Sequence, residues 1–456
     1  MSDSDGPEQF LYEKIKGPSK PNWKSRAKAF FDNSTFNGIL YMFANKSWAI
    51  RITWALVLLL AFGGFSTVTI LNIITLAQEP TSTSITITRE NELEFPAITI
   101  CSLSLLNETI LMSGGDTNIV NDLTSLLYEV QQENPNTERC EMIANNLARI
   151  TGQNISWGGL VTIAGNDFTS QLSHCTYKGK ICTADDFDKI NTIGGLCYTF
   201  NRQKALVAKG TGVRQGLQLQ LSPDDDVKFS LRRDAGFRIV IHNPDELPRP
   251  ESDGIVVGCS SNIYIGMRQV NSIDETQFSP GTRCKKDTDP HQELSIAGYA
   301  TYSPSLCQEE CFYKYAIDKC NCVERELYTP VSNAYKEKEN CTAPKLCCEV
   351  QAFDEVEENC DCPPKCSIVE CTLTVSSSTN ADGSVGIYVY YESLFLETRK
   401  TTDSYTPWSL ISDIGGNTGL FLGFTLLSWV ELVIFLTALI KDCCCGYKKQ
   451  KVSLQD

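Results

Sequence analysis

The chain has 456 residues, of which 42% are hydrophobic, and its formal net charge at pH 7 is −15. This acidic balance argues against a nucleic-acid-binding surface, which needs clustered Lys and Arg to neutralise phosphates. Of the 21 cysteines, all but the run at 443–445 fall between Cys101 and Cys371. That distribution excludes an ordinary cytosolic protein and indicates a disulfide framework in an oxidising compartment.

Residues 1–47 are expected to form a cytoplasmic segment, and residues 48–77 a first transmembrane helix. From Ile52 to Ala77 the chain contains no charged residue, and this stretch is longer than the roughly 20 apolar residues that cross a bilayer. A signal peptide is the alternative interpretation. It is disfavoured because the stretch is too long for the apolar core of a signal peptide and begins far from the N-terminus.

Charge asymmetry orients the chain in the plasma membrane. Residues 1–51 contain eight Lys or Arg against five acids, and the tail after Ile440 contains four against two. Both ends are therefore expected in the cytoplasm, and 78–407 outside the cell. This outer segment has 46 acidic and 28 basic residues. Such a surface concentrates cations, although acidic surfaces also serve simply to keep domains soluble.

The outer segment has patterns of both strands and helices. Alternating apolar residues predict strands over 84–101, at several places over 217–267, and over 386–394 as a last strand before the second span. Apolar spacings of three and four residues predict helices over 104–150. We therefore expect an α+β domain with a central sheet. Three sequons are candidate glycosylation sites: Asn107, Asn154 and Asn340.

Eleven cysteines crowd into 307–371, and two interpretations compete for them. Pairs such as Cys320 and Cys322 have a spacing that suits thiolate ligands of zinc. Thiols outside the cell are oxidised, however, and the chain has only 3 His. A ladder of disulfides that stiffens a helix is favoured, and each bridge contributes roughly 2–4 kcal/mol to stability. No metal and no cofactor are expected.

A second transmembrane helix is predicted over 408–440, followed by a cytoplasmic tail at 441–456. It is apolar except for Asp413 and Glu431, which on a straight helix would lie about 27 Å apart, near opposite faces of the membrane. Carboxylates within a membrane usually face protein or water and mark ion paths. Rings of such acids favour cations over anions.

One face of this helix has almost no side chains, because five residues of the run lie within about 100° of one another: Ser412, Gly415, Gly416, Gly419 and Gly423. Packing of small residues between helices is the alternative explanation. Together with the two acids, exposed backbone carbonyls favour a cation pore, particularly if the helix breaks near Gly423. One such helix cannot enclose a pore, so several subunits must contribute.

From about Ser34 to Glu431 the chain resembles the family of degenerins, epithelial sodium channels and acid-sensing channels. Four motifs carry the resemblance, in the family's order: Phe95-Pro96-Ala97-Ile98-Thr99-Ile100-Cys101; Tyr302-Ser303 followed by Cys307, Cys311, Cys320 and Cys322; Cys360-x-Cys362-x-x-x-Cys366; and Asp413-Ile414-Gly415-Gly416 through Gly423 to Glu431.

The resemblance implies a hand-shaped, disulfide-rich extracellular domain with helical finger and thumb regions around the sheet. It also implies a homotrimer or heterotrimer of same-family subunits in membrane lipid, permeant Na⁺ and an amiloride-type blocker. The selectivity filter would comprise Gly423, Phe424 and Thr425. Ser412 matches the degenerin site, where bulky residues hold channels open, and Gly419 matches the amiloride-contact position.

Two departures from the family pattern concern conduction. Asn37-Gly38 stands where the family has a His-Gly pair at the cytoplasmic entrance of the pore. In the filter, Phe424 is bulkier than the usual middle residue, and Thr425 replaces Ser. The order of preference among sodium, potassium and calcium is therefore left open.

The resemblance further implies five disulfides: Cys101–Cys197, Cys175–Cys182, Cys284–Cys366, Cys307–Cys362 and Cys311–Cys360. It places Cys320 and Cys322 in disulfides without assigning their partners. The partners of six further cysteines are also left open: Cys140, Cys259, Cys341, Cys347, Cys348 and Cys371.

The opening stimulus has two competing hypotheses. A cationic neuropeptide is favoured, because the compact chain and acidic exterior resemble the invertebrate peptide-gated branch. Protons are the alternative, since paired carboxylates with raised pKa values titrate near neutral pH. Constitutive conduction, an ATP-gated trimer and a two-pass receptor that does not conduct are further alternatives.

The sequence indicates no enzyme. It contains no nucleophile elbow, no phosphate loop and no His set with the spacing of metal ligands.

Overall fold

The structure is a computed structural model. It describes residues 47–112, 118–130, 137–151, 156–192, 195–203, 206–223, 235–277, 284–286, 302–323, 338–342, 345, 348, 352, 360–428, 430–431, 433–437 and 440. Asn37, Gly38, Asn154 and Cys347 lie outside these residues. The chain divides into two compact units. One contains both chain ends, up to Thr81 and from Asp403, and the other is Ser82–Thr402.

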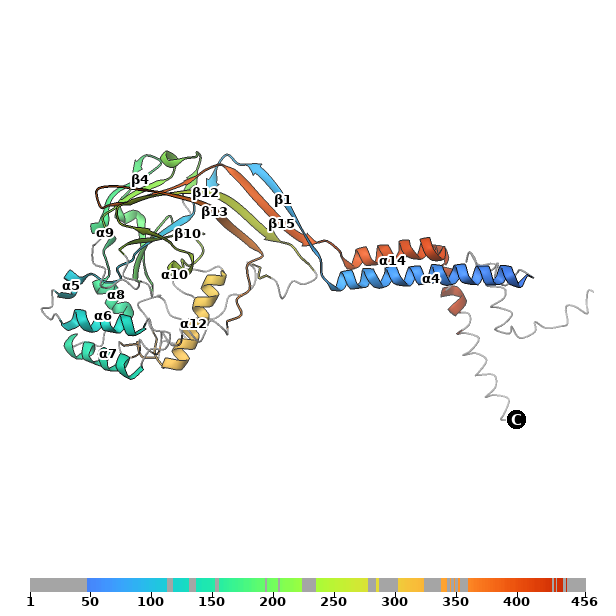
Figure 1. Ribbon diagram of the computed structural model, residues 1–456, viewed down its shortest axis with the longest axis horizontal. Coiled ribbons are helices and arrows are strands. Elements are labelled where there is room, and N and C mark those ends of the chain that lie inside the picture. The colour runs from blue at the N-terminus through green and yellow to red at the C-terminus, as the bar shows by residue number, and fades with distance from the viewer. Residues whose placement is uncertain are drawn as a thin grey trace, which may run out of the picture. The chain divides into compact units, whose positions relative to one another are not determined.

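The unit that contains the chain ends is helical. Helix α4 (Trp48–Ala77) is long and apolar enough to cross a membrane by itself. Helix α14 (Pro407–Leu422) packs along α4 (Figure 1). It is followed by a second helical piece, Leu426–Thr437, at an angle of 89°, and the two together pass the same test as one broken span.

The Ser82–Thr402 unit is built on an eight-stranded sheet with the order β1-β15-β12-β14-β9-β4-β5, in which β13 also pairs with β12. Its strands are β1 (Thr81–Arg89), β4 (Leu172–Tyr177), β5 (Lys180–Ile181), β9 (Leu217–Leu221), β12 (Ser261–Asp274), β13 (Ser367–Thr379), β14 (Val385–Tyr391) and β15 (Phe395–Asp403). The centre is β12, which runs antiparallel to β13 and parallel to β14 and β15.

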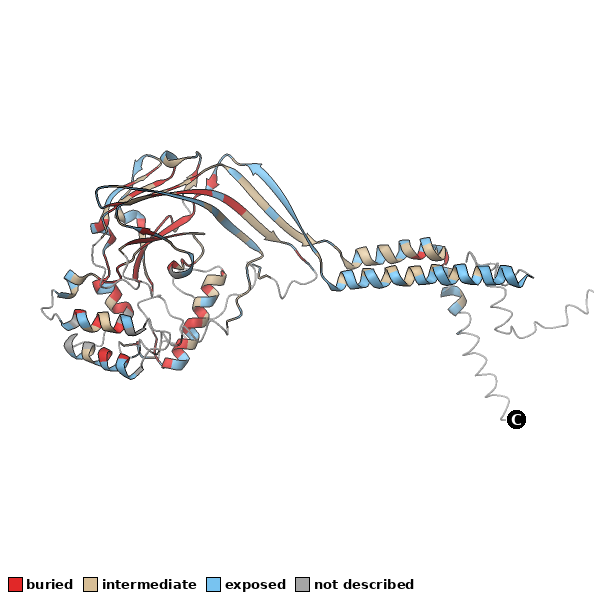
Figure 2. Ribbon diagram, viewed as in Figure 1, coloured by how far each residue is buried: buried red, intermediate tan, exposed pale blue. Residues whose placement is uncertain are grey.

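A second sheet has five strands in the order β11-β10-β3-β7-β6. Its strands are β3 (Ala97–Ser102), β6 (Phe187–Thr192), β7 (Gly195–Phe200), β10 (Gly236–His242) and β11 (Ile255–Gly258). A two-stranded sheet pairs β2 (Leu93–Glu94) with β8 (Val207–Ala208). The apolar faces of the two large sheets share one core, which contains Ile98, Phe237 and Ile387 (Figure 2).

The helices of this unit are α5 (Glu108–Met112), α6 (Asn118–Val130), α7 (Thr137–Thr151), α8 (Trp157–Ala164), α9 (Phe168–Gln171), α10 (Pro250–Asp253) and α12 (Pro304–Cys320). Helices α5, α6, α7, α8 and α12 share a second core, whereas Phe168 of α9 belongs to the core of the sheets. Leu123 of α6, Ile143 of α7 and Ile317 of α12 are buried together. The helices predicted over 104–150 and the strands predicted over 217–267 are therefore present.

One sequence prediction about the sheet is wrong. The strand over 386–394 corresponds to β14, but β14 is not the last strand, because β15 follows it and precedes α14. The sequence Phe-Leu-Glu-Thr-Arg-Lys-Thr-Thr-Asp of β15 is mostly polar. Its residues lie between β1 and β12 and none of them is buried, so the strand lacks the apolar alternation that reveals β14.

Disulfides link distant parts of this unit. All five pairings that the resemblance implies are formed. The structure also pairs Cys320 with Cys348 and Cys322 with Cys341. Three of these bridges start on α12, at Cys307, Cys311 and Cys320, so the predicted ladder along a helix is present. Cys140 is also disulfide-bonded, and Cys371 on β13 is a free thiol.

Candidate functional site

The segment that enters α14 is fixed by three hydrogen bonds. Thr406 is the N-cap of the helix: its Oγ1 accepts from the amide of Ser409 at 3.1 Å, and Oγ of Ser409 accepts from the amide of Thr406 at 3.4 Å. Pro407 occupies the first helical position, where its missing amide has no cost. The amide of Ser404 donates to the carbonyl of Pro80 at 2.9 Å, which joins the chain leaving α4 to the chain entering α14.

The carboxylate of Asp413 has a defined partner. The hydroxyl of Tyr405, eight residues earlier, donates to Oδ2 of Asp413 at 2.6 Å. Desolvation, the hydrogen bond to Asp413 and the negative charge of that carboxylate raise the pKa of Tyr405 to about 12. The phenol therefore stays protonated and acts as a donor at physiological pH. The sequence analysis singled out Asp413 but missed Tyr405.

The glycine face of α14 is open within the described part of the subunit. A Cβ added to Gly415 or Gly416 would meet no described atom within 4 Å, and one added to Gly419 would lie 3.5 Å from the carbonyl oxygen of Phe424. Ser412 of the same face is exposed. A face without side chains lets another backbone, or an ion with part of its water shell, come close to the main chain.

Helix α14 packs on α4 through its opposite side. A Cβ on Gly64 of α4 would lie 2.8 Å from the ring of Phe421. Phe421 is two residues beyond Gly419, about 200° around the helix. Among the described residues, Gly419 is therefore not part of the contact with α4 that Phe421 makes.

The predicted second transmembrane helix breaks at the residues that the resemblance assigns to the filter. Gly423 has a φ of +67°, in the left-handed region, and ends α14. Its amide donates to the carbonyl of Gly419 at 3.0 Å, and the amide of Phe424 donates to that of Thr418 at 3.3 Å. The second helical piece begins after Thr425. A break near Gly423 is the condition under which the sequence most strongly indicates a cation pore.

This break corrects the distance inferred between the two acids. The value of about 27 Å between Asp413 and Glu431 assumes one straight helix, whereas the residues lie on two pieces at 89°. Their placement near opposite membrane faces therefore does not follow from the number of residues between them. Both side chains are half-buried.

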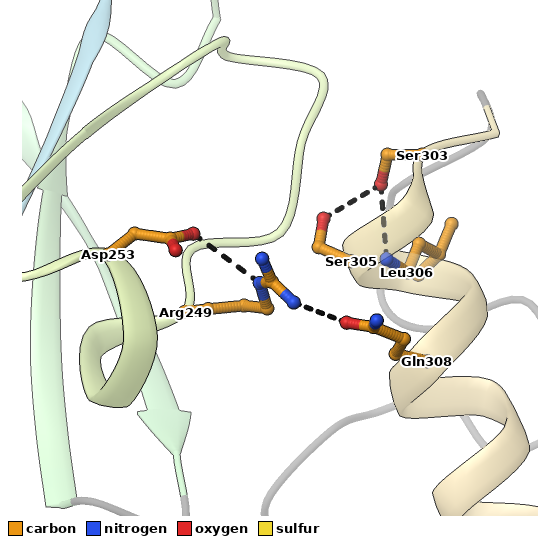
Figure 3. Close-up of polar contacts among 6 residues, drawn as sticks. All are labelled: Arg249, Asp253, Ser303, Ser305, Leu306 and Gln308. Carbon is orange, nitrogen blue, oxygen red and sulfur yellow. Dashed lines mark hydrogen bonds and ion pairs between the residues drawn. The ribbon is translucent and has the colours of Figure 1, made fainter. Parts of the chain in front are cut away.

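A second candidate site surrounds the disulfide-bonded helix α12 (Figure 3). Ser303 caps this helix by accepting from the amide of Leu306 at 3.1 Å. The guanidinium of Arg249, next to α10, donates to Oε1 of Gln308 on α12 and to Asp253 at 3.4 Å. Arg249 thus links the start of α12 to the neighbouring α10 region.

The next two residues of α12 are glutamates with buried oxygens. Among the described residues, no hydrogen-bond partner is found for Oε2 of Glu309 or for Oε1 of Glu310. Burial raises the pKa of both carboxyls to about 7, although the positive charge of Arg249 opposes the shift at Glu309 and that of Lys285 opposes it at Glu310. Both acids therefore titrate within the physiological range.

The remaining predicted sites are placed as follows. Asn107 is half-buried, and its Oδ1 accepts from the amide of Ile110 at the start of α5. Asn340 is exposed. Within the ranges described above, no group of three His, Cys, Asp or Glu is arranged to hold a metal ion.

The comparisons with known proteins identify the class. The sequence model of the family described as amiloride-sensitive sodium channel matches residues 30–435, which is most of the chain. The protein belongs to this family. Its members are ion channels and not enzymes, as the sequence predicts.

Individual relatives are distant, and two of the three reported below match more than nine-tenths of the chain. Acid-sensing ion channel 1 of Gallus gallus is 24% identical over 92% of this chain and 85% of its own length. The bile acid-sensitive ion channel of Homo sapiens is 24% identical over 94% of this chain and 90% of its own length. Degenerin del-1 of Caenorhabditis elegans is 27% identical over 60% of this chain and 45% of its own length. Among solved structures, a proton-activated chloride channel aligns with 84% of this chain and 97% of its own chain, at 8% identity. The TM-score of this alignment is 0.31, so it is no evidence for the fold or the function.

Proposed function

We propose that the chain is one subunit of a sodium-preferring cation channel of the plasma membrane that an extracellular stimulus opens. The observation that carries the proposal is the broken second span, whose glycine face is open and which has Asp413 near its start. In this proposal 48–77 and 408–440 cross the membrane, 1–47 and 441–456 are cytoplasmic, and 78–407 is outside. Three copies enclose the pore.

The filter in this proposal is Gly423, Phe424 and Thr425. The last carbonyls of a helix have no intrahelical partner and form the negative end of its dipole. Because α14 ends at Gly423, these carbonyls face the break, an arrangement that suits a partly dehydrated cation. The acids Asp413 and Glu431 raise the local cation concentration on either side of the filter along the chain.

The stimulus we propose first is a cationic neuropeptide, drawn to the acidic extracellular domain. A second candidate, protons, is supported by Glu309 and Glu310, whose pKa values of about 7 allow a charge change under mild acidification. Two relatives carry names that refer to acid and to bile acid, so small extracellular ligands are a recurring kind of stimulus among similar proteins.

Whole-cell recording from cells that express the chain tests the proposal. We expect an inward sodium current under an amidated cationic peptide or under acid, block by amiloride, and a persistent current when Ser412 is replaced by Trp. A current that follows acid and ignores peptides would select the second candidate. Absence of cation current in the Ser412→Trp variant, with the protein at the surface, would overturn the proposed function.

A further inference from the structure

The inner helical piece of the second span begins with a reciprocal cap. The amide of Ser428 donates to Oγ1 of Thr425 at 3.3 Å, and Oγ of Ser428 accepts from the amide of Thr425 at 3.2 Å. The two hydroxyl oxygens lie 3.1 Å apart. This arrangement satisfies two amides that the start of a helix leaves without an intrahelical partner.

The cap completes the set of bonds that fixes the proposed filter. The amides of Gly423 and Phe424 donate to main-chain carbonyls of the last turns of α14. The amide of Thr425 donates instead to a side chain, that of Ser428. Of the three acceptors, only the Ser428 hydroxyl can be removed by a substitution.

The surroundings of Ser428 make this bond important. Ser428 is 3% exposed, whereas Thr425, which it holds, is exposed. Because the Ser428 side chain is buried, bulk water does not readily take the place of its hydroxyl, so loss of this acceptor leaves the Thr425 amide unsatisfied or forces the chain to rearrange. Without the Ser428 hydroxyl, the last filter residue would change its orientation while α14 could keep its own hydrogen bonds.

We propose that Ser428 is a positioning residue for ion selection: it does not touch the ion but fixes the backbone and side chain of Thr425. This inference rests on the proposed function of 423–425 as the filter. It adds a specificity determinant outside the three filter residues, at a position that the sequence analysis did not single out.

The chain contains a matched control for this proposal. Thr406 and Ser409 form the same reciprocal cap at the start of α14, with their hydroxyl oxygens 3.0 Å apart. Replacing Ser409 by Ala therefore removes the same kind of hydrogen bonds from the same span, sixteen residues before Thr425, the last filter residue. A general loss of helix stability affects both variants, whereas a change of filter geometry affects only the Ser428 variant.

The test compares Ser428→Ala, Ser428→Thr and Ser409→Ala in the full chain. The Ser412→Trp background supplies current without a known ligand, and reversal potentials under sodium and potassium give the permeability ratio. We expect Ser428→Ala to lower the sodium preference roughly 3-fold to 10-fold, the change that loss of one hydrogen bond predicts. Ser428→Thr, which keeps the hydroxyl, and Ser409→Ala should retain the parent ratio. Surface labelling reports folding of each variant.

Several results would overturn the inference. One is an unchanged ratio in Ser428→Ala; another is an equal shift in Ser409→Ala. Where Ser428→Ala does not reach the surface, Ser428→Cys replaces it; failure of both to reach the surface, while Ser409→Ala does, would assign Ser428 a folding role only. The proposed function fails separately, if the parent channel itself shows no preference between the two ions or if substituting Thr425 leaves that preference intact.

Discussion

The hydroxyl of Tyr405 donates a hydrogen bond to Oδ2 of Asp413, with 2.6 Å between the two oxygens. Tyr405 lies in the extended segment before α14, and Asp413 lies in its second turn. The phenol therefore holds the acid of the proposed pore mouth in one orientation. A carboxylate that is hydrogen-bonded in place presents its charge to passing ions more consistently than one that rotates freely.

Replacing Tyr405 by Phe should reduce the attraction of cations to the pore mouth. We expect a lower unitary sodium conductance at low ionic strength and a smaller difference at high salt, because salt screens exposed charges. Asp413→Asn should cause a larger loss, and the double variant should be no worse than Asp413→Asn alone, since both changes act on one interaction. Single-channel recording measures all three.

The control for this prediction is Tyr390→Phe on β14, which removes a phenol hydroxyl from the Ser82–Thr402 unit instead of from the segment that enters α14. Its conductance should equal that of the parent channel. Additive losses in the Tyr405 and Asp413 double variant would show that the hydrogen bond is not what links the two residues.

The contact between Gly64 and Phe421 predicts a position where α4 tolerates no side chain. In Gly64→Val, the new Cβ would lie 2.8 Å from the ring of Phe421, and overpacking of this kind costs typically 1–3 kcal/mol. We expect less protein at the cell surface and a lower melting temperature in detergent. Adding Phe421→Ala to Gly64→Val should restore part of the surface abundance and part of the melting temperature.

The neighbouring glycine is the control for the packing prediction. A Cβ on Gly63 meets no described atom within 4 Å. Gly63→Val therefore changes hydrophobicity and helix propensity by the same amount as Gly64→Val but does not introduce the clash. Equal defects in the two glycine variants would mean that helix propensity, and not the Phe421 contact, limits assembly.

Sequence patterns predicted the parts of the molecule that follow local rules. The uncharged run through α4 and the cysteine spacing along α12 each depend on a few neighbouring residues. The open glycine face could also be predicted, because helical periodicity alone places Gly415 and Gly419 together.

Other features depend on partners that are distant in sequence or on several competing contacts. Strand β3 is buried at Ala97 and Ile98 alike, because it lies between β10 and β7, and so it lacks alternation. The pairing of Tyr405 with Asp413 spans eight residues across a helix start, which neither helix nor strand periodicity reveals. The partners of Cys320 and Cys322 likewise depend on the path of the chain after α12.

The buried acids of α12 predict a stability that rises on mild acidification. Their pKa in the folded protein, about 7, is above the ordinary value of 4.5, so the folded state binds more protons than the unfolded state between these two pH values. Stability therefore falls as pH rises through this window. The melting temperature of the purified protein should be higher at pH 5.5 than at pH 8.

Substitution separates these two acids from the many exposed ones. Glu309→Gln and Glu310→Gln each remove a buried charge, so each should raise the melting temperature at pH 8 and reduce its dependence on pH. Glu141→Gln, an exposed glutamate of α7, should leave the pH dependence unchanged. If all three variants keep the full pH dependence, other carboxyls are responsible for it.

The disulfide ladder of α12 predicts a clear difference between two cysteines. Cys311 bridges to Cys360 and joins residues 49 apart in sequence, so its loss frees a long loop in the unfolded chain and should cost roughly 2–4 kcal/mol. Cys371 is a free thiol, and Cys371→Ser removes no covalent link. We expect Cys311→Ser to lower the melting temperature by several degrees and to reduce surface abundance, while Cys371→Ser changes both only slightly.

The control for this prediction is the other half of the bridge. Cys360→Ser should match Cys311→Ser, and combining the two should add little, because each removes the same bridge. A double variant much less stable than either single variant would show that the two cysteines act independently, and that the bridge is not what stabilises α12.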